Sequence, residues 1–528
     1  MLHSLRLPAS LLTALALLAL ECQCYARSSP QKVLSRPVEV GPLQGTDCMQ
    51  GDSGSGLLKR FLASDVDLEE VLDIAVKDDL DIWQVTPNHV DVYWPPPSAQ
   101  SAASPAEDRL RAYPHTANAI PISAPRVPSA SQANNWTSSP SLSTFHEDYH
   151  PLHEIEAFMA QLARDYPALV QVIRVGISGE GRELLGVRIG RAPLQGTKSK
   201  GKSGAREKMG FVLTGAQHAR EWVATSTTLY LMHALVANRT DSDSLISLLD
   251  HFTFYIIPTP NPDGYDYTWE TDRFWYKNRM QTGPHSKCVG VDMNRNWGYK
   301  WRSTVSFAES SAAARPPPPT DTCSQWYPGN RAFEAPEVNH IAAYVDTLPN
   351  LKAFVDLRSY GQMISSPFSY SCSKTPKDAE NQLEAALGAA SAIRKAHGAA
   401  FVVRSALGPI PRRCLMFDAD VVVCCFVVLV FRRPDRCARH STRELPLPHH
   451  PTTLPPALLR DAHAGLRAHG NIVDWMYKRA GIKYSYAAHL RDTGTYGFAL
   501  PPRFIRAVGE ETANMIEYIS KFIVVVEK

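Results

Sequence analysis

The spacing of hydrophobic residues along the chain follows two patterns, and each pattern predicts a kind of element. Apolar side chains at residues 155, 158, 159 and 162 repeat at helical spacing, as do those between residues 515 and 523. Short apolar runs, typical of buried strands, occur at residues 170–175, 184–189, 211–214, 252–257, 352–357 and 482–488. Strands that alternate with helices favour an α/β fold with a mixed, mostly parallel sheet flanked by helices.

A smaller pattern precedes this domain. Asp67 followed by Glu70 is typical of a helix start, and the apolar residues after Asp67 share one helical face. Residues 82–85 and 90–94 are apolar at strand spacing, and the second run alternates cleanly. The pattern predicts a small α+β unit within residues 27–95, with helices packed on an antiparallel sheet.

Two stretches lack such patterning. Residues 96–144 are rich in Pro, Ser, Ala and Asn, which predicts an exposed linker before a large domain at residues 145–528. Within that domain, residues 404–469 crowd cysteines, prolines and arginines around an apolar run without helix or strand periodicity. We interpret this insert as translated intron or another gene-model error, with a genuine insertion loop as the alternative.

Residues 1–26 have the features of a secretory signal peptide. Arg6 precedes a mostly apolar run at residues 11–20, which is too short to span a membrane. We therefore expect a protein that is secreted or vacuolar, without a membrane span, and the sequons at Asn135 and Asn238 predict glycosylation on that route. A net charge of +3 over 528 residues argues against a nucleic-acid partner.

The first candidate chemistry lies where the run at residues 211–214 ends. His218 and Glu221 follow it three residues apart, just before a predicted helix, and can point to the same side. In α/β sheets, ligands bind at the carboxyl ends of the strands. An imidazole and a carboxylate at this spacing supply half of a catalytic zinc site, which takes three protein ligands and leaves one position for water. Such a pair is more often a surface histidine and an exposed glutamate, but the rest of the chain favours a metal site.

An ordered series of motifs gives the chain a family resemblance. They are His218-Ala-Arg-Glu221, Asn261-Pro-Asp-Gly264, Asp292-Met-Asn-Arg295-Asn-Trp297, Ser359-Tyr360 and Leu490-Arg-Asp-Thr-Gly494. With them the chain resembles the zinc carboxypeptidases of the pancreatic A/B type, over about residues 145–403 and 470–528. The resemblance implies the eight-stranded-type mixed sheet of that family, preceded by a propeptide-like unit. Within the family, the chain is most similar to fungal secreted proteins regarded as inactive and linked to cell-wall organisation.

The resemblance implies roles for individual positions. His218 and Glu221 match the first two zinc ligands, and Asn294 and Arg295 match the pair that grips a substrate's C-terminal carboxylate, for which a planar guanidinium is suited. Val473 falls where side-chain preference is set, which implies an apolar pocket. The positions implied to contact substrate are Arg220, Tyr276, Asn294, Arg295, Ser359 and Tyr360. The resemblance also implies a disulfide between Cys288 and Cys323.

Four positions depart from the family pattern. The third zinc-ligand position holds Arg358, which has no free lone pair and whose charge opposes a metal. His489 stands where the family has its general-base glutamate, and Tyr276 where it has the arginine that stabilises the oxyanion. The mobile active-site tyrosine aligns near Leu466, within the insert.

These departures predict a secreted pseudoenzyme that binds peptide or protein C-termini, with cell-wall proteins among the candidate partners. Zinc, at one per chain, would be held weakly or lost. The alternative is a working zinc metallocarboxypeptidase with an altered site, which releases C-terminal apolar residues and uses His489 as base or as substitute ligand. A third interpretation is that residues 50–95 stay attached and plug the pocket.

Overall fold

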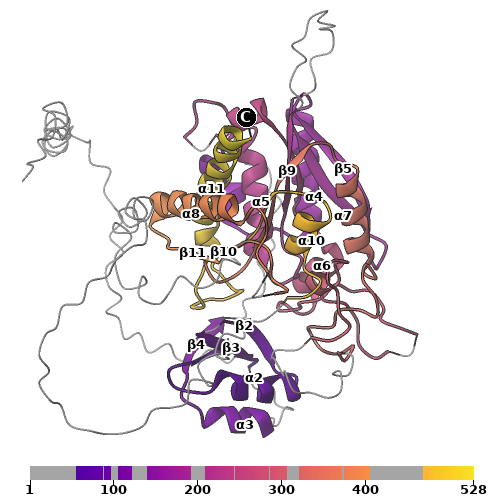
Figure 1. The fold of residues 1–528 in the computed structure, drawn as a ribbon, viewed down its shortest axis with the longest axis vertical. Coiled ribbons are helices and arrows are strands. Elements are labelled where there is room, and N and C mark those ends of the chain that lie inside the picture. Colours follow the sequence, from indigo (N-terminus) through magenta and orange to yellow (C-terminus); the bar gives the residue numbers. More distant parts are fainter. Residues whose placement is uncertain are drawn as a thin grey trace, which may run out of the picture. The chain divides into compact units, whose positions relative to one another are not determined.

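The large domain of this computed structural model is built on one mixed sheet of eight strands (Figure 1). In sheet order the strands are β11 (Val402–Arg404), β10 (Met363–Ser365), β12 (Tyr484–His489), β9 (Leu351–Arg358), β7 (Met209–Thr214), β8 (Phe252–Ile257), β6 (Glu183–Ile189) and β5 (Val170–Ile177). The central strands β12, β9, β7 and β8 run parallel, whereas β6 and β5 at one side and β10 at the other pair antiparallel. The predicted α/β fold is confirmed.

The structure describes residues 55–86, 88–96, 105–121, 139–191, 208–242, 244–284, 286–305, 320–371, 374–404 and 468–527, all within one unit of the chain, residues 53–528. The predicted signal peptide, Asn135, Leu466 and nearly all of the predicted insert lie outside the described residues.

Helices cover both faces of the sheet. On one face pack α4 (Leu152–Asp165), α5 (Trp222–Ala234), α8 (Ala379–His397) and α11 (Ile505–Val526), and α8 and α11 lie side by side in Figure 1. On the other face pack α7 (Pro336–Asp346) and α10 (Ile472–Lys478). Alternate residues of a strand serve the two cores: Phe211 and Leu213 of β7 join the first, and Val212 joins the second. All of α5 is buried, so it has no polar face for a periodicity to reveal.

The small N-terminal unit is a four-stranded sheet with two helices. Its elements are β1 (Ser55–Leu62), α2 (Leu68–Lys77), β2 (Asp81–Val85), β3 (His89–Trp94), α3 (Pro105–Arg111) and β4 (Thr116–Pro121), with strand order β2-β3-β1-β4. Asp67 caps α2 as its sequence position predicts, and its side chain accepts a hydrogen bond from the backbone N–H of Glu69.

The linker prediction for residues 96–144 needs correction. This stretch contains α3 and β4, and β4 pairs antiparallel with β1 along the edge of the small sheet. Within β4 only Ile120 is buried, so the edge strand shows no apolar alternation in the sequence. The small unit therefore extends to residue 121, beyond the predicted end at residue 95.

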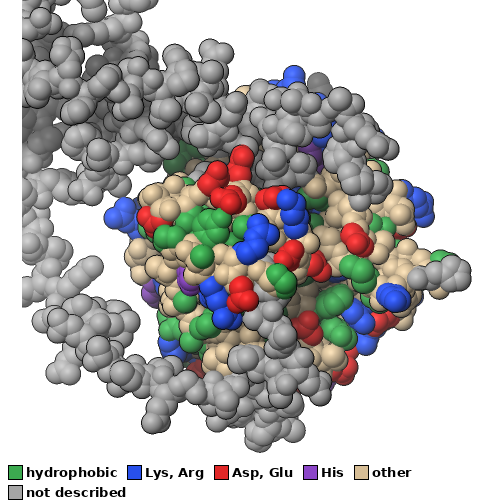
Figure 2. Space-filling model, turned by 90° about the horizontal axis from the view of Figure 1, so that it is seen from below, with side chains coloured by type: hydrophobic (Ala, Val, Ile, Leu, Met, Phe, Trp, Pro, Cys, Tyr) green, Lys and Arg blue, Asp and Glu red, His purple; other side chains and the backbone are tan. Residues whose placement is uncertain are grey.

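Four further sequence features concern the described surface and cross-links. Cys288 and Cys323 form a disulfide, as the resemblance implied. No helix of the described residues is long and apolar enough to cross a membrane. On the face shown in Figure 2, acidic and basic side chains are interspersed without one sign dominating, as expected from the small net charge. Asn238, in the predicted sequon, is exposed at the turn after α5.

A buried histidine pair makes stability depend on pH. His146 Nε2 lies 3.0 Å from His233 Nδ1 beneath α5, and both rings are almost fully buried. Burial first, and then the neighbouring charges of His233, His150 and Arg506, hold the pKa of His146 well below its usual value. Below about pH 6.5 the unfolded chain therefore binds a proton at His146 that the folded chain does not.

We expect the free energy of unfolding to fall by about 2 kcal/mol through His146 between about pH 7 and pH 5. Stability is present above the unfolded pKa and is lost as the pH falls toward the folded pKa. Urea unfolding of wild type and His146→Gln at both values measures it, and the variant should show the shallower pH dependence. Equal pH dependence in the two proteins would contradict the assignment.

Candidate functional site

The ends of three elements bring the candidate residues together. His218 and Glu221 lie in the turn from β7 into α5, and Glu221 is the residue before the helix starts. Arg358 is the last residue of β9, the parallel neighbour of β7. Carboxyl ends of neighbouring parallel strands meet at one edge of a sheet, so three residues far apart in sequence become neighbours. All three side chains are buried.

Arg358 binds the two residues that were predicted as zinc ligands. Its Nε donates to Glu221 Oε2 at 2.9 Å and its Nη2 donates to Glu221 Oε1 at 3.2 Å. The same Nη2 makes a short hydrogen bond with His218 Nδ1. On the far side, Nη1 donates to Asp356 Oδ2 at 3.2 Å. Each guanidinium nitrogen therefore has an acceptor, and the fork binds the carboxylate in bidentate fashion.

Both ring nitrogens of His218 lie next to carboxylates. Its Nε2 lies 3.0 Å from Asp292 Oδ1, and a carboxylate at that place accepts a hydrogen bond from Nε2–H. Nδ1 lies 3.0 Å from Glu221 Oε1 and also contacts Nη2 of Arg358. The ring of Tyr276 stacks on the imidazole with centroids 3.7 Å apart.

The guanidinium of Arg358 and the carboxylates beside it shift each other's pKa values. Burial alone would raise the pKa of Glu221, but the Arg358 guanidinium and His218 lower it to about 2. Burial would likewise lower the pKa of Arg358, yet the carboxylates of Glu221 and Asp356 raise it above its usual value. Both partners are therefore ionised across the physiological pH range.

His489 lies beside this ion pair. It ends β12 and is the register partner of Arg358 in the parallel pairing of β12 with β9. Desolvation, and then the charge of Arg358, lower its pKa to about 4. The imidazole is thus neutral near pH 7 and has little tendency to take up a proton there.

Two of the predicted carboxylate-binding residues lie next to Asp292. The side chain of Arg295 is 8% exposed, and its Nε lies 3.6 Å from Asp292 Oδ2. Its guanidinium lies 5.6 Å from the centre of the Trp326 ring. Asn294 accepts a hydrogen bond from the backbone N–H of Ile472, at the start of α10. Arg295 and His218 therefore both lie next to Asp292, and the Asn294 side chain contacts the start of α10.

The small unit contacts the predicted substrate-binding residues. Asp81 accepts hydrogen bonds from Arg220 Nη1 at 2.8 and 3.1 Å. Gln84 Nε2 donates to the backbone carbonyl of Tyr360 at 3.1 Å, and Tyr360 donates its hydroxyl to Asp91 at 2.7 Å. That the unit stays attached and plugs a pocket remains a prediction.

An aromatic cluster reinforces the same contact. Trp83 of β2 stacks on Tyr93 of β3, with ring centroids 4.6 Å apart. Across the boundary between the small unit and the large domain, its ring lies 4.9 Å from Phe274 and 4.9 Å from Phe498. Trp83 is 6% exposed, so residues of the small unit and of the large domain together remove the indole from water.

Sequence reasoning missed Asp356 as a member of the site. It is fully buried and accepts hydrogen bonds from Thr214 Oγ1 at 2.7 Å, Gln217 Nε2 at 2.8 Å and Arg358. The available signal was a single carboxylate in the otherwise apolar run that precedes Arg358 in β9. Ser359 follows Arg358, and its backbone N–H donates to Glu221 at 3.3 Å.

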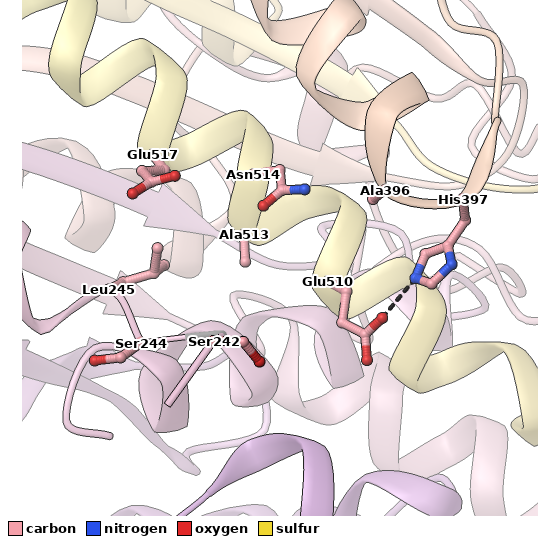
Figure 3. Close-up of a pocket in the computed structure, with 9 residues that line it drawn as sticks. All are labelled: Ser242, Ser244, Leu245, Ala396, His397, Glu510, Ala513, Asn514 and Glu517. Atoms are coloured by element: carbon pink, nitrogen blue, oxygen red, sulfur yellow. Dashed lines mark hydrogen bonds and ion pairs between the residues drawn. The ribbon is translucent and has the colours of Figure 1, made fainter. Parts of the chain in front are cut away.

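A separate cleft lies away from these residues. It occupies about 290 Å³ between α11, the end of α8 and the residues Ser242, Ser244 and Leu245, and none of the candidate residues lines it. Figure 3 shows His397 and Glu510 side by side at one end of it, joined by an ion pair. Its lining is mostly polar.

Comparison with known proteins places this geometry in context. The model of the zinc carboxypeptidase family matches residues 155–420 and 433–515. A relative named inactive metallocarboxypeptidase ECM14, from Blastomyces gilchristii, is 34% identical over 392 residues, which cover 73% of this chain and 56% of the relative. The protein of the same name from Talaromyces marneffei is 33% identical over 384 residues, which cover 72% and 55%. The chain thus spans about half the length of these relatives.

Solved structures share the fold. Thrombin activatable fibrinolysis inhibitor superposes with a TM-score of 0.63 at 24% identity, covering 90% of this chain and 99% of that one. Carboxypeptidase A from Helicoverpa armigera has a TM-score of 0.63 at 22% identity, covering 90% and 98%. At these identities the likeness establishes the architecture alone.

Proposed function

Because the chain belongs to the zinc carboxypeptidase family, we propose that it is a non-catalytic member that binds the C-terminal end of peptides or proteins. The observation that carries this proposal is the ion pair of Arg358 with Glu221, extended to His218. The matched relatives are named inactive metallocarboxypeptidases, which supports the same assignment for this chain.

The residues present do not fit the zinc ion that the family name implies. A catalytic zinc needs three protein ligands with free lone pairs. Here Nδ1 of His218 and both oxygens of Glu221 are engaged by Arg358, and arginine cannot itself act as a ligand. Within the described parts of the chain, no group of three or more His, Cys, Asp or Glu is placed to hold a metal.

Two further features support the loss of catalysis. A neutral His489, of pKa about 4, lies where the resemblance implied a general base. Burial raises the pKa of Tyr276 well above its usual value, so its phenol stays neutral where the resemblance implied an arginine. Neither residue supplies the charge that the family pattern has at that position.

What supports binding is the polar pair next to Asp292. Arg295 carries a planar guanidinium, a group whose geometry suits a carboxylate. Val473 is buried on α10, close in sequence to Ile472, which contacts Asn294. These features favour a ligand with a free C-terminal carboxylate and an apolar last side chain. We extend the proposal to a secreted or vacuolar protein, which the signal-peptide pattern supports, and to cell-wall proteins as partners, which only the family resemblance supports.

We expect a short peptide with an apolar last residue to bind the full chain more tightly as the free acid than as the C-terminal amide. Arg295→Ala should remove that preference and weaken binding of the acid by about 10- to 100-fold, because a hydrogen bond to a charged group contributes about 1.5–3 kcal/mol. Isothermal titration calorimetry of both peptides measures it.

Two variants sharpen this experiment. Arg302 is an exposed arginine outside the site, and Arg302→Ala should leave both affinities unchanged. Asp81→Asn weakens the contact of the small unit with Arg220 and should tighten binding of the acid. Equal affinity of acid and amide for the wild-type chain would count against peptide-end binding.

A further inference from the structure

The cation of Arg358 lies where two ligand atoms converge. His218 Nδ1 and Glu221 Oε1 are 3.0 Å apart, and Arg358 Nη2 contacts both. Zinc binds such atoms at about 2.0–2.2 Å in tetrahedral geometry, which brings the atoms of two ligands to about 3.4 Å from each other. A nitrogen and a carboxylate oxygen that converge in this way on one cationic centre have the arrangement of a metal site, with a guanidinium in place of the ion.

We propose that the guanidinium of Arg358 replaces the metal ion structurally. As a cation that belongs to the chain itself, it holds His218 and Glu221 together, so the site assembles without zinc and excludes zinc. The inference concerns how the site is held together, and it does not depend on what the pocket binds.

The hydrogen bonds around His218 support this. A metal-binding histidine usually donates its other ring N–H to a carboxylate, which fixes the tautomer and aims the lone pair at the metal. His218 has that arrangement, because its Nε2 faces Asp292 Oδ1 at 3.0 Å. Its Nδ1 contacts both the guanidinium of Arg358 and Glu221 Oε1.

Asp356 shows that the surroundings suit a guanidinium in particular. Arg358 reaches Glu221 with Nε and Nη2, and its remaining nitrogen, Nη1, donates to Asp356. Thr214 and Gln217 also donate to Asp356 and hold it in place. A buried arginine is stable where each of its donors finds an acceptor, and this one has two carboxylates and an imidazole.

The same contacts exclude zinc. Zinc could reach Nδ1 of His218 and the oxygens of Glu221 only if the guanidinium moved away from both. That movement would leave the charge of Arg358, now 4% exposed, without Glu221 in a buried place. Two ligands bind zinc much more weakly than three, so the ion cannot compensate.

The test compares metal content and thermal stability in full-length wild type, Arg358→His and Arg358→Met. We expect wild type to hold no zinc after dialysis against micromolar zinc, and its Tm to be the same with zinc and with chelator. Arg358→Met should lower the Tm by several degrees, and zinc should not restore it. Arg358→His should have a low Tm with chelator, take up about one zinc per chain and regain stability.

Two controls separate the proposal from general effects of removing an arginine. Arg273 is half-buried and donates to the backbone carbonyls of Arg220 and Phe498. Arg273→Met should lose stability without any response to zinc. Arg358→His combined with His218→Ala should lose the zinc uptake.

About one zinc per wild-type chain, lost in His218→Ala, would overturn the proposal, as would an Arg358→Met protein as stable as wild type. If Arg358→His does not fold, the wild-type zinc content and the Tm of Arg358→Met still decide. Peptide binding in the wild type tests the proposed function separately, because it needs neither zinc nor these variants.

Discussion

Glu221→Ala should lower the free energy of unfolding by about 3–5 kcal/mol in metal-free buffer. The variant leaves the buried guanidinium of Arg358 with Asp356 as its only carboxylate, and the Nε donor loses its acceptor. Removing one member of a buried ion pair costs more than the pair contributes, because the remaining charge is left desolvated. Urea unfolding of wild type and variant in chelator measures the difference.

The size and sign of this change in stability distinguish a site held together by Arg358 from a zinc site that has lost its metal. Where the carboxylate served only as a zinc ligand, chelator would already have removed its partner, and alanine would cost little or would relieve an unpaired buried charge. Glu517 provides the control: it forms an exposed pair with Lys521 on α11, and Glu517→Ala should change stability by less than about 0.5 kcal/mol. A Glu221→Ala protein as stable as Glu517→Ala would contradict the account.

The sequence predicts the central sheet well because its strands are buried on both faces. Continuous apolar runs such as β8, residues 252–257, are bounded by polar and turn-forming residues, and these runs carry the strand signal. Helix α11 is predicted equally well, since it keeps one apolar face along its length.

Edge elements and contacts between distant segments are less predictable. β4 of the small unit buries one residue only, and α3 before it lies in a stretch whose composition is typical of a linker. The contact of Asp81 with Arg220 joins residues 139 positions apart, and nothing local in the sequence indicates it. Such pairings arise from tertiary packing, which local patterning does not encode.

For the site, the sequence identified the participants but not their bonding. The position of Arg358 was predicted to oppose a metal, and the structure adds that its guanidinium binds His218 and Glu221. Asp356 was missed because the apolar pattern of β9 predicts a buried strand and assigns no role to a polar residue within it. The roles that the resemblance implied for Tyr276 and His489 stay proposals.

The second large effect concerns catalysis. Removing one oxyanion donor costs about 100- to 1,000-fold in rate, and general acid–base catalysis contributes about 100- to 10,000-fold. A chain with a neutral phenol at Tyr276, a weakly basic His489 and an arginine in place of a metal ligand should therefore be many orders of magnitude slower than a working family member. The alternative is an altered enzyme in which Arg358 moves away and His489 completes the site.

The most direct test of non-catalytic function is hydrolysis of a short peptide with an apolar C-terminal residue, followed by mass spectrometry at high protein concentration. The assay uses the full chain and Asp81→Asn, with zinc and with chelator, and Glu221→Ala as the blank. We predict no release of the last residue above that blank in any condition. Zinc-dependent release by wild type or Asp81→Asn that is lost in Glu221→Ala would contradict the account and establish an active carboxypeptidase.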